Sequence, residues 1–151
     1  MANEIFPDEG LDYILGVIPK AGTTPATLYL GLFTSQTAST VPAANMVLAT
    51  PTGITEAAYT SYARVSMASA VWGAQGVKTS WSQTGRGVTA SQQSFPAAGA
   101  AYATAINGFF LATALTGGIC VYASNFDDTT AVATLAIGDV IRVTPTLTLL
   151  N

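Results

Sequence analysis

Few side chains in this chain could carry out acid–base or metal chemistry. Its 151 residues include no histidine and one cysteine, Cys120. Histidine is the commonest general base and transition-metal ligand in proteins, so its absence removes both roles and rules out a zinc site of the usual His/Cys type. Cys120 lies in the apolar run GGICVYA, which is typical of a small buried side chain rather than of a reactive thiol. The sequence therefore predicts a protein that is not an enzyme and binds no cofactor.

The eight carboxylates offer the remaining chemistry. Asp127 and Asp128 stand side by side in SNFDDTT, where adjacent acids on a turn are usually solvated; the alternative is a weak calcium site that also uses Asn125. No dinucleotide-binding, P-loop or nucleophile-elbow motif occurs, and GRG at residues 85–87 is a turn signal too short to bind phosphate. We expect no catalytic residue, and cation binding by the aspartate pair stays open.

Two arginines lie inside apolar segments that resemble strands. Arg64 occurs in YARVSM on the same face as Tyr62, and Arg142 occurs in DVIRVTP on the same face as Val140. An arginine in so charge-poor a chain should meet a carboxylate or a row of carbonyl oxygens. That partner lies either within the chain or on a neighbouring subunit. Both arginines are therefore candidate interface residues.

The overall composition limits the classes of partner. Charged residues make up 9% of the chain, against about 25% in a typical soluble domain. A surface with so few charges repels itself weakly, which favours its burial against another subunit. The net charge of −3 leaves no basic patch for nucleic acid. No apolar run approaches the ~18–20 residues that span a membrane and no signal peptide is recognisable, so we expect no membrane contact and assembly in a host cytoplasm.

The length predicts a single domain over residues 1–151, with an N-terminal helical segment at residues 1–22. From residue 7 to residue 18, apolar residues recur with the spacing of a half-buried helix: Leu11, Ile14, Leu15 and Ile18. The acids Asp8, Glu9 and Asp12 suit the positive end of the helix dipole. We expect Leu11 and Leu15 to close one end of the β domain, and Ile5 and Phe6, which precede the helix, to reach out to a partner.

The rest of the chain has the composition of strands and turns. TLYLGLFTS, residues 27–35, is apolar on both faces and predicts a central strand. Residues 36–60 predict an extended arm that makes contacts. Further strands are expected at residues 62–72, 77–82, 87–95, 106–114, 118–123, 131–137 and 140–149, with tight turns at Thr116-Gly117 and Gly138-Asp139. This pattern predicts a mainly β fold, an antiparallel β-sandwich or jelly roll.

The order of these segments carries a family resemblance. A helix of the type NEIFPDEGLDYILGVIP precedes an LYLGLFTS-like strand, a Pro/Thr-rich arm, a YARV-like strand and a final GDVIRVTPTLTLL. This order resembles a group of small virion proteins of tailed bacteriophages, described as capsid decoration (cement) or tail-associated proteins. The resemblance implies a β-sandwich that oligomerises on a repeating lattice and has no catalytic residues to transfer.

Decoration of the capsid is the function that the resemblance implies first. Such a protein is located in the virion, forms a homotrimer and stabilises the phage head by binding the major capsid protein. The alternative is a tail- or fibre-associated virion protein, which would share the fold but attach at fewer sites. A third possibility is a ligand- or sugar-binding β module, which would need exposed aromatic side chains on one concave face.

Overall fold

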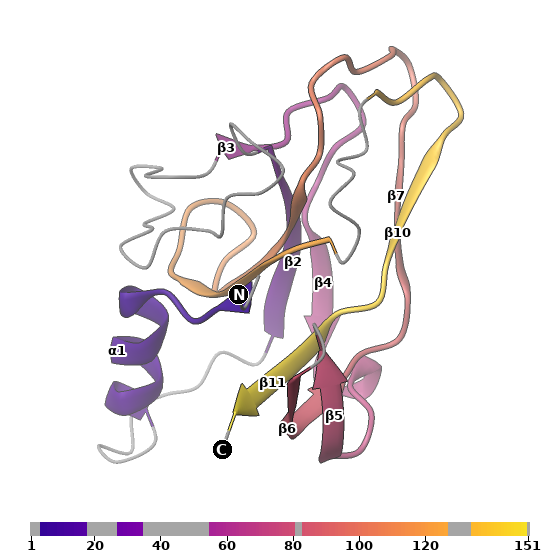
Figure 1. Ribbon diagram of the computed structural model, residues 1–151. Coiled ribbons are helices and arrows are strands. Elements are labelled where there is room, and N and C mark those ends of the chain that lie inside the picture. The colour runs from indigo at the N-terminus through magenta and orange to yellow at the C-terminus, as the bar shows by residue number, and fades with distance from the viewer. Residues whose placement is uncertain (1–3, 18–26, 35–54, 81–82, 127–133, 151) are drawn as a thin grey trace.

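Antiparallel strands are the main regular element of the protein, as its computed structural model shows (Figure 1). The structure describes residues 4–17, 27–34, 55–80, 83–126 and 134–150. Its elements in chain order are β1 (Glu4–Ile5), α1 (Asp8–Val17), β2 (Thr27–Thr34), β3 (Thr55–Glu56), β4 (Val65–Ala68), the 3-10 turn η1 (Ser69–Val71), β5 (Gly76–Ser80), β6 (Gln83–Thr89), β7 (Gln93–Pro96), β8 (Gly108–Ala112), β9 (Cys120–Asn125), β10 (Val140–Val143) and β11 (Thr146–Leu150). The predicted mainly β, antiparallel fold is confirmed.

The largest sheet is built around β2. Its strand order is β1-β9-β8-β2-β3, and β4 pairs with the first half of β2 on the side where β3 pairs with its last residues. Leu30 and Leu32 of β2 enter the main core on one face, whereas Phe33 enters a second core on the other. A strand buried on both faces must be apolar throughout, so the predicted central strand is confirmed.

The two cores lie on opposite faces of this sheet. The main core gathers side chains from the six-stranded and the two-stranded sheets, among them Met67, Phe95, Leu111, Tyr122 and Ile141, and the partly buried Leu147 of the third sheet packs against it. The second core is smaller and consists of Phe33, Phe110, Ala112, Cys120 and Ala123. Cys120 is fully buried there with its Sγ 3.6 Å from the carbonyl oxygen of Tyr122, so its expected role as a small apolar core residue is confirmed.

Two smaller sheets form a continuous bent ribbon. The ribbon pairs β7 with β10 at one end and β6 with β11 at the other, and β5 adds a third strand beside β6. Single strands were expected at 87–95 and 140–149, but both break where Ala90 and Pro145 face each other. The amide of Ala90 donates to the carbonyl of Pro145 at 2.9 Å, while Pro145 itself has no N–H to donate to a ladder. The two strands therefore turn a corner together.

Other predicted strands are shortened or absent. Residues 62–72 form a strand only at β4, followed by η1, and the described part of 131–137 forms a single bridge between Leu135 and Tyr102. β8 and β9 form the expected hairpin, but residues 113–119 connect them, a longer loop than the tight turn expected at Thr116-Gly117. Gly117 and Gly118 in this loop have positive φ of 59° and 80°. Gly138, at φ 95°, makes the expected tight turn. The GRG run, read as a turn signal, lies instead inside β6.

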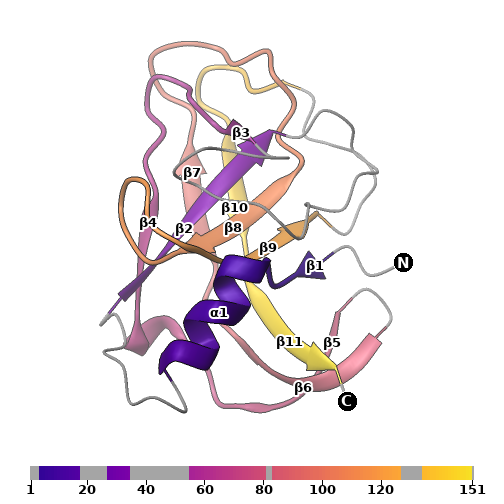
Figure 2. The ribbon, with the colours of Figure 1, turned by 90° about the vertical axis from the view of Figure 1, so that its left-hand side faces the viewer.

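The N-terminal helix is confirmed, but its orientation differs from the expected one. Gly10 faces β9 so closely that a β-carbon there would stand 2.5 Å from the carbonyl oxygen of Val121. Its lack of a side chain lets the helix backbone approach the strand, so the face carrying Gly10 is the buried one. Leu11 and Leu15 are consequently 44% and 60% exposed, and the expectation that they close the domain is wrong. Figure 2 shows α1 in front of the sheets.

The predicted arm at residues 36–60 is only partly described, because residues 35–54 lie outside the described residues. Its last part belongs to the folded domain rather than to an extended arm. Thr55 and Glu56 pair with the end of β2, and Ala57 and Tyr59 are buried in the main core. Residues 55–60 are therefore not part of an extended arm.

Candidate assembly surface

A buried polar cluster ties three parts of the chain together. Arg64 donates from Nε to Oε1 of Glu56 and from Nη2 to Oε2, both at 2.8 Å. Its Nη1 donates to the carbonyl oxygens of Ala114 and Gly117 at 2.6 and 2.7 Å. The Arg64 side chain is 3% exposed and that of Glu56 31% exposed. A buried guanidinium is stable only with such complete pairing. Of the two kinds of partner considered for Arg64, the structure shows the one within the chain, and the buried side chain offers no surface for the expected contact with a neighbouring subunit.

The hydroxyl of Tyr62 completes the cluster at the edge of β2. β3 pairs with the end of β2 and β4 with its beginning, which leaves the amide of Leu32 between them. That amide donates to the Tyr62 hydroxyl at 3.0 Å, and the hydroxyl donates to Oε1 of Glu56 at 2.8 Å. Burial, followed by the neighbouring charge of Glu56, raises the pKa of Tyr62 far above its ordinary value. The hydroxyl therefore stays protonated and substitutes for a missing strand neighbour.

The two motifs that carried the family resemblance meet at this cluster. Tyr62 and Arg64 come from YARV, and Gly31 comes from LYLGLFTS. A β-carbon on Gly31 would overlap the ring of Phe110 and stand 2.8 Å from the Tyr62 hydroxyl. The guanidinium of Arg64 lies over the Phe110 ring, 4.9 Å from its centroid. The motifs are therefore a packing unit, and their residues hold the turn between β8 and β9.

Arg142 is placed differently from Arg64. It lies on the exposed face of β10 together with Val140 and Thr144, while Ile141 and Val143 are buried. Within the described part of the chain, no carboxylate lies within ion-pair distance of its guanidinium. The alternation expected from the sequence is thus confirmed. The proposed contact of Arg142 with another subunit stays a prediction.

The segment before the helix is attached to the main sheet. Ile5 of β1 pairs with Ala123 of β9, at the edge of the sheet. The half-buried ring of Phe6 packs edge-on against that of Tyr122, with 5.1 Å between the centroids. Phe6 therefore points at least partly inward, and it also lines the cleft described next. The expected contact of Ile5 and Phe6 with a partner stays a prediction.

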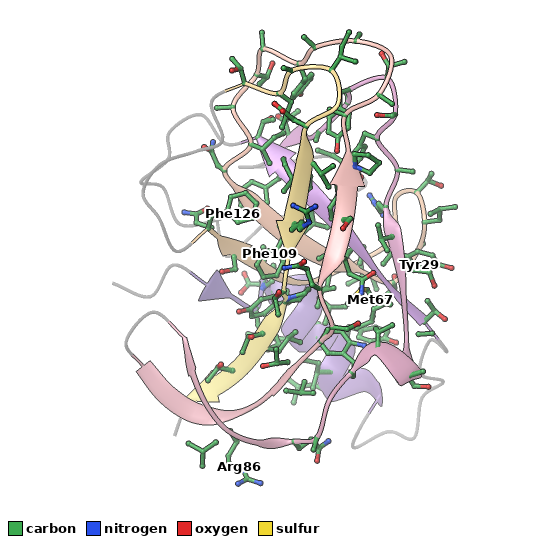
Figure 3. All side chains as sticks on the ribbon, turned by 90° about the vertical axis from the view of Figure 1, so that its right-hand side faces the viewer. Tyr29, Met67, Arg86, Phe109 and Phe126 are labelled. Carbon is green, nitrogen blue, oxygen red and sulfur yellow. The ribbon has the colours of Figure 1, made fainter. Side chains whose placement is uncertain are left out.

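A cleft of about 380 Å³ separates α1 from the small sheet β5-β6-β11. Phe6, Leu11 and Ile14 line it on the helical side. On the sheet side Val88 pairs with Leu147 across the strands, so both project from one face. Arg86, two residues before Val88, belongs to the same face, and its side chain projects from the small sheet away from the ribbon at the bottom of Figure 3. The cleft is therefore apolar with one cation at its rim.

This cleft was not predicted from the sequence. Arg86 was read only as part of the GRG turn signal, and Leu11 only as a residue that closes the domain. The alternation of Arg86 with Val88 was a signal of a strand face, but the glycines on either side of Arg86 obscured it. The helix orientation that leaves Leu11 at the cleft depends on Gly10, whose contact with β9 no local pattern reveals.

The described residues contain no group of three or more side chains suited to hold a metal ion. Asp127 and Asp128, considered above for a weak calcium site, lie outside those residues. No helix in the described ranges is long and apolar enough to cross a membrane. The aromatic rings of Tyr59, Tyr62 and Tyr102 pack against one another rather than forming an exposed platform for a sugar.

A known protein family matches most of the chain. The sequence model of the family described as podophage GP4 fiber I protein gp80 matches residues 11–148. The matched range begins within α1 and ends within β11, so it covers both motifs, the polar cluster and almost all of the cleft. No curated protein matches the sequence.

Proposed function

Because the chain belongs to the family of the podophage GP4 fiber I protein gp80, and is thus a structural protein of a tailed-phage virion, we propose that it is a component of a tail fibre. The observation that carries this proposal is the extent of the family match, from residue 11 to residue 148. Because the match extends over the whole β fold, it does not depend on one short shared motif. The virion location expected from the sequence agrees with it.

The fold suits a fibre component mechanically. The central strand β2 is held on both sides, and the Glu56–Arg64 pair fixes the turn between β8 and β9 to it. Hydrogen bonds in such a network are distributed over several chain segments, so a local pull is shared among them. We propose that residues 1–151 act as one non-enzymatic domain whose role is to keep its shape within the particle.

Decoration of the capsid is the second candidate. The family name favours the tail- or fibre-associated alternative over the decoration role, in which the chain would bind the major capsid protein. Self-association is part of the present proposal, because few charges cover the surface and Leu11, Leu15 and Val77 are exposed. The homotrimer implied by the resemblance to decoration proteins stays a prediction.

Location in the particle tests the proposal. Purified virions of the phage that encodes this chain are labelled with gold-conjugated antibodies against the recombinant protein and imaged by electron microscopy. Label on the tail is expected, together with a copy number, measured by quantitative mass spectrometry, far below that of the major capsid protein. Label spread evenly over the head at a copy number near that of the shell subunits would instead establish decoration.

A further inference from the structure

The outward side of α1 has an ordered pattern. Asp8, Leu11, Asp12 and Leu15 are all exposed, and they follow the i, i+3, i+4, i+7 spacing of one helical stripe. Carboxylates and leucines therefore alternate along a single face of the helix. A helix stripe of this kind normally buries its leucines, at roughly 1.5–3 kcal/mol for each large side chain. We call these four residues the helix stripe.

The cleft beside α1 has the complementary character. Apolar side chains of Phe6, α1, β6 and β11 form most of its lining, Gln75 adds a polar group, and Arg86 is a cation at its rim. Val77 of β5, which pairs with Arg86, is 68% exposed and extends the apolar surface beyond the cleft. A ligand that fills this cleft needs apolar side chains in its middle and a carboxylate opposite Arg86.

We propose that the occupant of this cleft is the helix stripe of a second copy of the chain. Leu15 of one copy enters the cleft of the other, and Asp12, one turn before it on the same stripe, faces the partner copy's Arg86. Leu11 belongs to both the stripe and the cleft lining, so the two surfaces adjoin on each molecule. Because the two surfaces adjoin, both copies can exchange the contact about one two-fold axis, which closes the assembly as a dimer. The inference does not depend on where in the particle the chain is located.

Charge reversal tests the contact directly. Sedimentation velocity of the full chain over a range of concentrations should show a species of twice the 15.4 kDa monomer. Asp12→Arg and Arg86→Asp should each weaken the dimer about tenfold or more, because each places two like charges together in the interface. The double variant, which exchanges the two charges, should recover most of the lost affinity. Leu15→Gln should weaken the dimer without any change in charge.

A control keeps the test specific. Ile137→Gln changes an exposed apolar residue, 66% exposed, in the turn before β10. That turn lies at the far end of the molecule from α1 (Figure 1). This substitution should not alter the dimer, and circular dichroism checks that every variant is folded. A monomer at all concentrations, or an oligomer of any size that persists in both single charge-reversal variants, would overturn the proposal.

Discussion

Glu56 and Arg64 meet side-on, with both carboxylate oxygens accepting from the guanidinium at 2.8 Å. The remaining guanidinium nitrogen donates to the turn between β8 and β9, so one side chain joins the edge of β2 to a hairpin formed much later in the chain. The pair is unequal in burial, because Glu56 retains access to water and Arg64 does not. Replacement of Arg64 and replacement of Glu56 should therefore change the stability of the protein by different amounts.

Replacement of Arg64 by alanine should lower the free energy of unfolding by about 3 kcal/mol, near the lower end for breaking a buried ion pair, because Glu56 can be solvated again. The same replacement at the exposed Arg142 should change it by less than about 0.5 kcal/mol. Urea titrations of the two variants make the comparison. Equal effects would contradict a structural role for the Glu56–Arg64 pair.

The Tyr62 hydroxyl should make stability depend on alkaline pH. Its removal in Tyr62→Phe leaves the amide of Leu32 unpaired, which costs about 1–3 kcal/mol near neutral pH. Since the folded-state pKa of Tyr62 is raised, the hydroxyl contributes its stability fully below the unfolded-state pKa of about 10 and loses it as pH rises further.

The difference in unfolding free energy between wild type and Tyr62→Phe should therefore be constant up to about pH 9 and then shrink by as much as about 1.4 kcal/mol per pH unit above pH 10. Groups that titrate in both proteins cancel in this difference. Denaturant titrations at a series of pH values measure it. A difference that stays constant through the alkaline range would show that Tyr62 ionises equally easily in the folded and unfolded chains.

Gly31 should tolerate no side chain. Gly31→Ala pushes a β-carbon into the ring of Phe110 and should cost about 1–3 kcal/mol. Gly76→Ala is the matched control, because no heavy atom outside its chain neighbours lies within 4 Å of the added β-carbon, and it should be neutral or stabilising by up to about 1 kcal/mol. In combination with Phe110→Leu, the cost of Gly31→Ala should fall, as a double-mutant cycle would detect.

The helix orientation predicts unequal effects of two leucine truncations. Leu15→Ala should change the stability of the monomer by less than about 1 kcal/mol, since Leu15 is 60% exposed and alanine favours the helix. Leu30→Ala, at a fully buried position, should cost about 2–5 kcal/mol. Thermal unfolding at concentrations where the chain is monomeric separates the two. A large cost at Leu15 would place it in the core, as the sequence had suggested.

Local patterns were sufficient where burial alone decides structure. The apolar faces of β2 predicted a central strand, and the alternation around Arg142 predicted that it shares a face with Val140. An arginine inside an apolar strand needs a polar partner, and this requirement predicted that Arg64 would be paired. Its partner could not be named, because Glu56 is one of eight acids and nothing in the spacing distinguishes it.

Contacts between distant segments decided the features that sequence reasoning missed. The helical stripe of leucines had two possible orientations, and Gly10 selected the outward one through its contact with β9. The corner at Ala90 and Pro145 requires two strands to break at the same level, which neither strand reveals alone. The cleft depends on both the helix orientation and this strand corner, since it lies between α1 and the strands beyond the corner.

The position of β2 between β8 and β4 determines when the protein can fold during synthesis. β2 leaves the ribosome before every strand that pairs with it, and its pairing with β8 spans much of the chain. Such distant pairings fold slowly, because chain entropy is lost before the contacts are gained. Until the β8–β9 hairpin has been synthesised, the apolar β2 has no partner on that side and is prone to intermolecular pairing. Aggregation in the host should therefore increase when translation stalls between β4 and β8.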